Sequence, residues 1–117
     1  MHVTAELTAI LPKRRGALAD LLDVLDQAGV AARALCLVDT GDYALARFVP
    51  DDADKGRAAV EQAGIPCATA AVLVIPSDPG RLAEALHLLA EARAPVFYVY
   101  AGASVTVLGC PDAERAA

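Results

Sequence analysis

Hydrophobic and polar residues alternate along positions 3–11, which is the pattern of a strand with one buried face. After a polar turn at 12–15 the period changes, and leucines at positions 18, 21, 22 and 25 share one face of a predicted helix. Gly29 is expected to end this helix, because glycine readily adopts the left-handed conformation found at many helix ends. The first 29 residues therefore predict a strand followed by an amphipathic helix.

The same reasoning divides the rest of the chain. Two short apolar runs separated by a Thr-Gly-Asp turn predict an antiparallel hairpin over 34–49. Asp52 is a candidate N-cap for a second helix, which Gly64 would end. The apolar segment 67–76 predicts one long strand, or two short strands that meet near Ala70. Further elements are expected as a helix after the turn at 77–80, strands at 96–100 and 104–109, and a last helix at 111–117.

An internal repeat explains this order of elements. A shift of 64 residues aligns Gly16 with Gly80 and superimposes the leucine patterns of the two helices that follow. Each copy has the order strand, helix, strand, strand, helix, so the sequence predicts two repeats over 1–70 and 71–117. The second repeat is expected to be truncated, because its last helix has barely begun and its closing strand is missing.

The segment DPGRLAEALHLLAEARAPVFYVYA at 78–101 resembles the ACT domain, which has an Asp-Pro-Gly turn before a leucine-patterned helix. The strand Tyr98-Val99-Tyr100-Ala101 strengthens this resemblance, and Gly16-Ala17-Leu18-Ala19 carries it in the first copy. A βαββαβ unit of this kind places two helices on one face of an antiparallel sheet, in the ferredoxin-like manner. We therefore expect an α+β fold with two ACT-type repeats side by side and the helices on one face of the sheet.

The resemblance also implies a function. ACT modules are regulatory units that bind amino acids, frequently at interfaces between units, and they change the assembly or activity of a partner. The expected function is thus a small-molecule-binding regulatory protein that senses an amino acid at the turn–helix junctions between its repeats. The alternative is an ACT-like module that binds no small molecule and serves oligomerisation or interaction, or acts as the regulatory subunit of an amino-acid biosynthetic enzyme.

The turn of the second repeat has the chemistry to hold a free amino acid. The first turn of a helix supplies unpaired N–H groups for a carboxylate, and Asp78 could pair with the ammonium group. Pro79 fixes its own φ and stiffens the turn. The candidate N–H donors belong to Gly80, Arg81 and Leu82. The same residue types also form ordinary helix-opening turns that bind no ligand, and the sequence leaves this second interpretation open.

The first repeat departs from this pattern, because the 64-residue shift places Arg14 opposite Asp78 and Arg15 opposite Pro79. Three interpretations follow. The first repeat has lost its site, which would leave one site per chain; or Arg14 or Arg15 holds a carboxylate in bidentate fashion; or the cations form a solvated loop that meets a partner. We favour the first. The binding candidates of this junction are Arg14, Arg15, Gly16, Ala17 and Leu18.

Tyr98 and Tyr100 are two positions apart on a predicted strand, so both face the same side. Packing in the core is one interpretation of the pair. In the other, one hydroxyl lines a ligand pocket between the turn at 77–80 and this strand.

Composition and charge exclude several classes of function. The 117 residues carry a formal charge of −5, and the only run of adjacent cations is at 13–15, so we expect no nucleic-acid partner. No apolar run approaches the ~18 residues of a membrane span, and the N-terminal residues do not have the pattern of a signal peptide. We therefore expect a cytoplasmic protein that does not bind membranes.

The sequence also argues against catalysis and against a cofactor. Three cysteines without a CxxC pair are expected to be small buried residues, and two distant histidines give no metal cluster. No nucleophile–base motif or phosphate-binding loop is present. We expect no enzyme and no cofactor. The expected partners are an amino acid or related metabolite, an amino-acid metabolic enzyme, and a second copy of the chain, because exposed sheet edges favour pairing.

Overall fold

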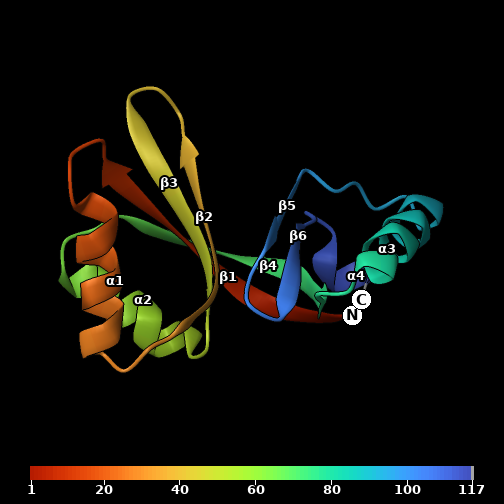
Figure 1. Cartoon of the computed structure of the whole chain (residues 1–117), viewed down its shortest axis with the longest axis horizontal. Helices are drawn as coiled ribbons and strands as arrows, with labels where there is room; N and C mark the ends of the chain where they lie inside the picture. The colour runs from red at the N-terminus through yellow and green to blue at the C-terminus, as the bar shows by residue number, and fades with distance from the viewer. Residues whose placement is uncertain (117) are drawn as a thin grey trace.

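The computed structural model of the chain describes residues 1–116, and its strands and helices follow the predicted order (Figure 1). The structure has the following elements: β1 (His2–Pro12), α1 (Ala17–Gln27), β2 (Ala32–Asp39), β3 (Tyr43–Pro50), α2 (Ala53–Gln62), β4 (Cys67–Pro76), α3 (Pro79–Glu91), β5 (Tyr98–Ala101), β6 (Val105–Gly109) and α4 (Ala113–Ala116). Of the last predicted helix, residue 117 lies outside the described residues.

Local sequence signals set several of these boundaries. The side chain of Asp52 caps α2 by accepting a hydrogen bond of 3.1 Å from the N–H of Lys55, as predicted. The segment 67–76 forms one continuous strand and not two short ones. The buried face of α1 is narrower than its leucine pattern predicts, because Leu22 is 37% exposed. Its buried residues are Ala17, Leu21 and Leu25.

The strands form one antiparallel sheet in the order β2-β3-β1-β4-β6-β5. The two central strands are the first strands of the two repeats, and in their register Glu6 lies opposite Ala70, its own equivalent under the 64-residue shift. The repeats are therefore related by an approximate twofold axis between these two residues. β1 lies beside β4, in the position that a closing strand of the second repeat would take.

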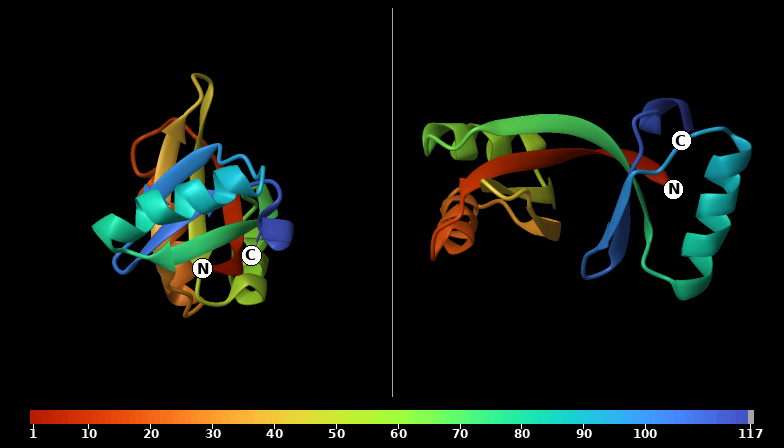
Figure 2. Two further views of the ribbon diagram at one scale, coloured as in Figure 1. Left: turned by 90° about the vertical axis from the view of Figure 1, so that its right-hand side faces the viewer. Right: turned by 90° about the horizontal axis from the view of Figure 1, so that it is seen from above.

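Two apolar clusters hold the helices to one face of the sheet. The first packs α1 and α2 against β1 and β3, and the second packs α3 and α4 against β4 and β6. β1 and β4 run side by side from one end of the molecule to the other, with α1 and α2 at one end and α3 at the opposite end (Figure 2). The predicted α+β fold of two ACT-type repeats with helices on one face is confirmed. The division between residues 70 and 71 falls inside β4, which both repeats share.

The other face of the sheet is also covered, because the sheet coils until its two edges meet. Ala34 of β2 forms an isolated bridge with Gly102, just after β5. Close approach requires glycine there, because an added Cβ at position 102 would lie 2.2 Å from the carbonyl oxygen of Arg33. We call this contact the seam. A third apolar cluster fills the space behind it, with Val49, Val72 and Val107 fully or almost fully buried.

Neither a membrane-spanning helix nor a metal-binding group of side chains is found in residues 1–116: none of the helices there has the length and apolar character to span a bilayer, and no cluster of His, Cys, Asp and Glu could hold a metal ion.

Candidate functional site

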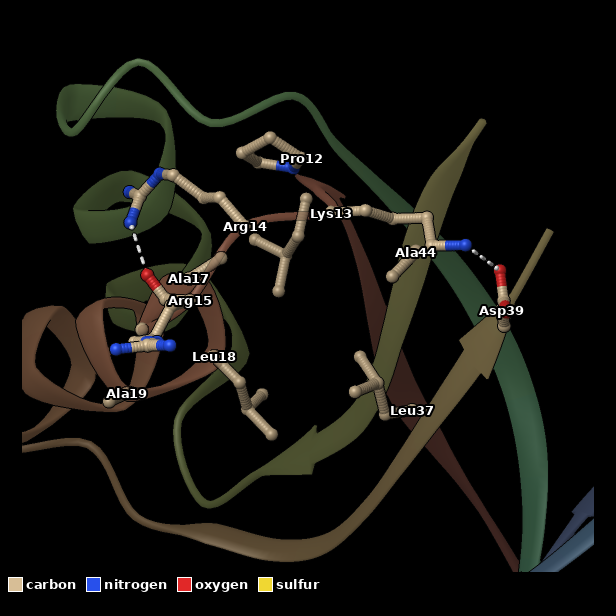
Figure 3. A pocket seen from close by; sticks show the side chains of 12 residues that line it. Pro12, Lys13, Arg14, Arg15, Ala17, Leu18, Ala19, Leu37, Asp39 and Ala44 are labelled. Atoms are coloured by element: carbon tan, nitrogen blue, oxygen red, sulfur yellow. Dashed lines mark hydrogen bonds and ion pairs between the residues drawn. The ribbon is translucent and has the colours of Figure 1, made fainter. Parts of the chain in front are cut away.

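A cavity of about 590 Å³ lies at the turn–helix junction of the first repeat, between the start of α1 and the β2–β3 hairpin (Figure 3). Its lining comes from three segments that are distant in the sequence: residues 11–19, two residues of β2 and one of β3. All five binding candidates of the first junction line it, namely Arg14, Arg15, Gly16, Ala17 and Leu18. The structure therefore brings this set of predicted residues together around one cavity.

The start of α1 offers hydrogen-bond donors to this cavity. Gly16 occupies the N-cap position with φ of +84° and provides no side chain to cap the helix. Within residues 1–116 the N–H groups of Leu18 and Ala19 have no acceptor. Unpaired N–H groups and the helix dipole together give this end of α1 a partial positive charge, which favours an anion.

The three cations of the turn are not equivalent. Lys13 pairs with Asp39 at 2.9 Å and donates to the carbonyl of Gly41, and Arg14 pairs with Asp20 at 2.9 Å. The side chain of Arg15 is exposed and has no hydrogen-bond or ion-pair partner in the described part of the chain. The guanidinium of Arg15 is therefore free to bind an anionic group at the edge of the cavity.

Asp39 places one carboxylate on the opposite side of the cavity from Arg15 (Figure 3). The hydrogen bond from the N–H of Gly41, and then the contact with Lys13, lower the pKa of Asp39 below its ordinary value. The group is thus charged at neutral pH. Between Asp39 and Arg15 the lining is apolar, and Leu37 is 51% exposed there. The cavity combines a free cation, a carboxylate and an apolar wall.

The junction of the second repeat is arranged differently. The Asp78 carboxylate accepts a hydrogen bond of 3.0 Å from the N–H of Gly80, so it caps its own helix. The N–H of Arg81 donates to the Asp78 carbonyl. The turn itself therefore uses the carboxylate and two of the three donors that the sequence suggested for a ligand. The adjacent cavity is about 130 Å³, and of the five candidates of this junction only Arg81 lines it.

The two junctions do not lie between the repeats of one chain. β1 and β4 are antiparallel, so the turns that follow them are at opposite ends of the sheet. Figure 1 shows this separation, with α1 and α3 at the two ends of the molecule. The predicted location of a site between the repeats is therefore corrected for the single chain: each junction faces outward.

Tyr98 and Tyr100 lie away from both junctions, in the third apolar cluster. Both hydroxyls donate to the carboxylate of Glu6, at 2.5 and 2.8 Å. The Arg47 guanidinium lies 3.6 Å from Glu6 and 4.2 Å from the centre of the Tyr98 ring. Burial, followed by the hydrogen bond to Glu6, raises the pKa of each tyrosine above its ordinary value. This arrangement agrees with core packing, and neither tyrosine lines the cavity at either junction.

Sequence reasoning missed several of these residues. Glu6 has the polar position of an alternating strand, which predicts a solvent-facing side chain, yet it is completely buried. Its partner Arg47 carried no signal of its own. Lys13 was recognised only as part of a cationic run. The apolar stretch at 34–38 could have suggested Leu37 as a cavity residue only if the fold had been known.

Comparison with known proteins gives both a family and similar structures. The sequence matches the family described as "ACT domain pair" over residues 1–115. Among solved structures, a protein of Bacteroides thetaiotaomicron is 24% identical with a TM-score of 0.82, covering 97% of this chain and 83% of that one. The regulatory subunit of aspartate kinase from Thermus thermophilus, in a ligand-free form, is 19% identical with a TM-score of 0.70, covering 99% of this chain and 92% of that one.

The regulatory subunit of aspartate kinase from Thermus flavus is similar at 20% identity, with a TM-score of 0.66 and the same coverage of 99% and 92%. These identities are low, so the solved structures support the fold alone. No curated protein matches the chain.

Proposed function

The chain belongs to the family of paired ACT domains, and from this premise we propose that it is a regulatory protein that binds an amino acid in the cavity of its first repeat. The observation that carries the proposal is the Arg15 guanidinium, unpaired within residues 1–116, beside the uncapped start of α1. Both groups favour an anion at the same edge of one cavity. Of the three interpretations of the first junction, this is the one in which an arginine holds a carboxylate.

The lining of the cavity suits the groups of a free amino acid. Arg15 and the N–H groups at the start of α1 bind its carboxylate. Because the carboxylate and ammonium groups of a free amino acid share one carbon, Asp39, on the opposite side of the cavity from Arg15, does not bind the α-ammonium group. It accepts a cationic group at the end of the ligand's side chain, in competition with Lys13. Leu18 and Leu37 contact the apolar part of that side chain. One such site per chain is expected, in the first repeat and not in the second, because the carboxylate of Asp78 already caps α3.

The partner we propose is an enzyme of amino-acid metabolism. Two similar structures are regulatory subunits of aspartate kinase, and they cover almost the whole of this chain. In this proposal the chain has no catalytic step of its own, and the amino acid changes how it acts on the enzyme.

A thermal-unfolding panel of the twenty amino acids tests the site. At 100 times its dissociation constant, the ligand stabilises the folded chain by about 2.7 kcal/mol, which raises Tm by about 10 °C. Arg15→Ala is expected to remove the shift, because it removes the free cation. Asp78→Ala is expected to lower the starting Tm through loss of a helix cap but to keep the shift.

Two results would contradict this proposal in different ways. A panel in which no amino acid changes Tm would favour the alternative, a module that binds partners and no small molecule. A shift that survives Arg15→Ala and disappears in Asp78→Ala would place the site in the second repeat.

We also propose that two copies of the chain pair through β2. This strand is an edge of the sheet, and within residues 1–116 the bridge from Ala34 is the only strand pairing on its outer side. Natural edge strands are commonly protected by charges, yet the stretch 36–38 has none, and Leu37 and Val38 expose apolar side chains on its two faces. Pairing of β2 with β2 about a twofold axis satisfies the free main-chain groups and covers both side chains.

Sedimentation at several protein concentrations tests the dimer with two matched variants. Val38→Lys places a charge on β2 outside the cavity and is expected to give a monomer. Val99→Lys places the same charge on the other edge strand, at a side chain that is 44% exposed, and is expected to leave the dimer intact. A wild-type chain that is monomeric at all concentrations would refute the pairing.

A further inference from the structure

We infer that the β2–β3 hairpin connects the cavity of the first repeat to the buried cluster around Glu6, so that a change at the cavity alters how firmly the two repeats close on each other. Glu6, Arg47, Tyr98 and Tyr100 form this cluster, which we call the clasp. Only the idea that a bound ligand acts through this connection rests on the proposed function. The connection itself depends only on contacts within the chain.

The clasp is a polar contact between the repeats inside an apolar region. Glu6 and Arg47 belong to the first repeat, and Tyr98 and Tyr100 belong to the second. The Glu6 carboxylate is completely buried, and both of its oxygens accept a phenol proton. In residues 1–116 every buried side-chain polar atom has a hydrogen-bond partner. Closure of the repeats is therefore what satisfies these buried groups.

Few other contacts hold β5 in place. It is a strand of four residues that pairs with β6 on one side. On its other side the seam between Ala34 and Gly102 is an isolated bridge. The two phenol hydrogen bonds, together with the packing of Tyr98 and Tyr100 in the third apolar cluster, therefore fix β5 against the first repeat. Segments held by so few contacts open locally before the rest of the fold.

The same two strands line the cavity and carry the clasp. β2 has Leu37 and Asp39 at the cavity and Ala34 at the seam. β3 has Ala44 at the cavity and Arg47 in the clasp. These strands pair along their length, so the hairpin is expected to move as one unit. Any shift of its tip therefore reaches both contacts between the repeats.

Lys13 ties the tip of the hairpin to the cavity. Its ammonium group pairs with Asp39 at 2.9 Å (Figure 3) and also donates to the carbonyl of Gly41 at 3.0 Å. A cationic group of the ligand's side chain at Asp39 would compete with this tie. The tie is therefore the point at which occupancy of the cavity changes the position of the hairpin.

Hydrogen exchange of the β5 amides tests the connection without a ligand. Lys13→Gln breaks the tie, and because an exposed ion pair contributes only modestly, we expect exchange over 98–101 to become up to about fivefold faster. Arg57→Gln is the matched control, because Arg57 also forms an exposed ion pair, with Glu61 on α2, and a second hydrogen bond, to Thr69 on β4, both outside the hairpin. This control is expected to leave β5 exchange unchanged. Tyr98→Phe and Tyr100→Phe, which remove single hydroxyls, are expected to accelerate exchange at β5 directly.

A second readout comes from the tyrosines themselves. The chain has no tryptophan and three tyrosines, so in a Tyr43→Phe background the fluorescence arises from the clasp pair. Lys13→Gln is expected to change this emission and Arg57→Gln is not. If the Phe variants accelerate β5 exchange but Lys13→Gln changes neither readout, the connection through the hairpin is wrong. If the Phe variants also leave β5 exchange unchanged, the clasp does not hold the repeats together.

The ligand arm separates this inference from the proposed function. Each amino acid that raises Tm in the thermal panel is added to the Tyr43→Phe protein, and the clasp emission is expected to change on binding. A panel without any shift would overturn the proposed function but not the effect of Lys13→Gln. A ligand that binds with no change in emission or β5 exchange would overturn the inference and leave the proposed function standing.

Discussion

Replacing Gly102 with alanine is expected to open the seam and to lower the free energy of unfolding by about 1–3 kcal/mol, the usual cost of forcing an extra methyl group into a packed site. The added Cβ would lie 2.2 Å from the carbonyl oxygen of Arg33 and 2.7 Å from the Cβ of Ala34. Neither atom can rotate away, because one is backbone and the other is the first side-chain atom. The strands must therefore separate.

Urea unfolding of this variant measures the effect. Gly80→Ala is a suitable control, because Gly80 lies in the first turn of α3 and an added Cβ would meet only the Asp78 carboxylate, at 3.7 Å. Alanine favours a helix more than glycine does. The control is therefore expected to be as stable as the wild type or slightly more so. Equal midpoints for Gly102→Ala and the wild type would show that the seam is not a close contact.

Replacing Glu6 with alanine is expected to have the largest effect, a loss of about 3–5 kcal/mol, because removal of one partner from a buried charged cluster leaves the others without compensation. Arg47 would lose its ion-pair partner, and both phenols would lose their acceptor. Such a loss is a large fraction of the total stability of a domain, which is about 5–15 kcal/mol. Glu6→Gln keeps the size of the side chain and one acceptor oxygen, so it should be less harmful.

Chemical denaturation at neutral pH measures this loss, and Glu61→Ala provides the control. Glu61 pairs with Arg57 on the surface of α2, where exposed ion pairs contribute little. An effect of Glu6→Ala no larger than that of Glu61→Ala would mean that the buried carboxylate is not what holds the repeats together.

Glu6→Ala is also expected to change how the stability of the chain depends on pH in the alkaline range. Burial and then the hydrogen bond to Glu6 raise the pKa of Tyr98 and Tyr100, so the folded chain holds these phenol protons more tightly than the unfolded chain. This contribution to stability is complete below about pH 10, the ordinary pKa of tyrosine, and is lost as the pH rises above it. Without Glu6 one cause of the raised pKa is gone, so stability should fall less steeply above pH 10.

The candidate site could be predicted in part. The residues from Arg14 to Leu18 do line one cavity, because a turn between a strand and a helix is a local feature that sequence spacing can locate. Sequence spacing could not decide which of the two junctions holds the candidate site. Whether Asp78 faces a ligand or caps its own helix depends on a side-chain rotamer, and the sequence allows both.

Periodicity, capping residues and the internal repeat together determined the order of the elements, the two ACT-type units and the family resemblance, because these signals act over a few residues or repeat along the chain. Only the tertiary structure decided that β1 lies beside β4, that the sheet coils until Ala34 meets Gly102, and that Glu6 is buried. The physical reason is distance along the chain: Glu6 and Tyr98 are 92 residues apart, and no local pattern encodes which side of a strand a distant segment will cover.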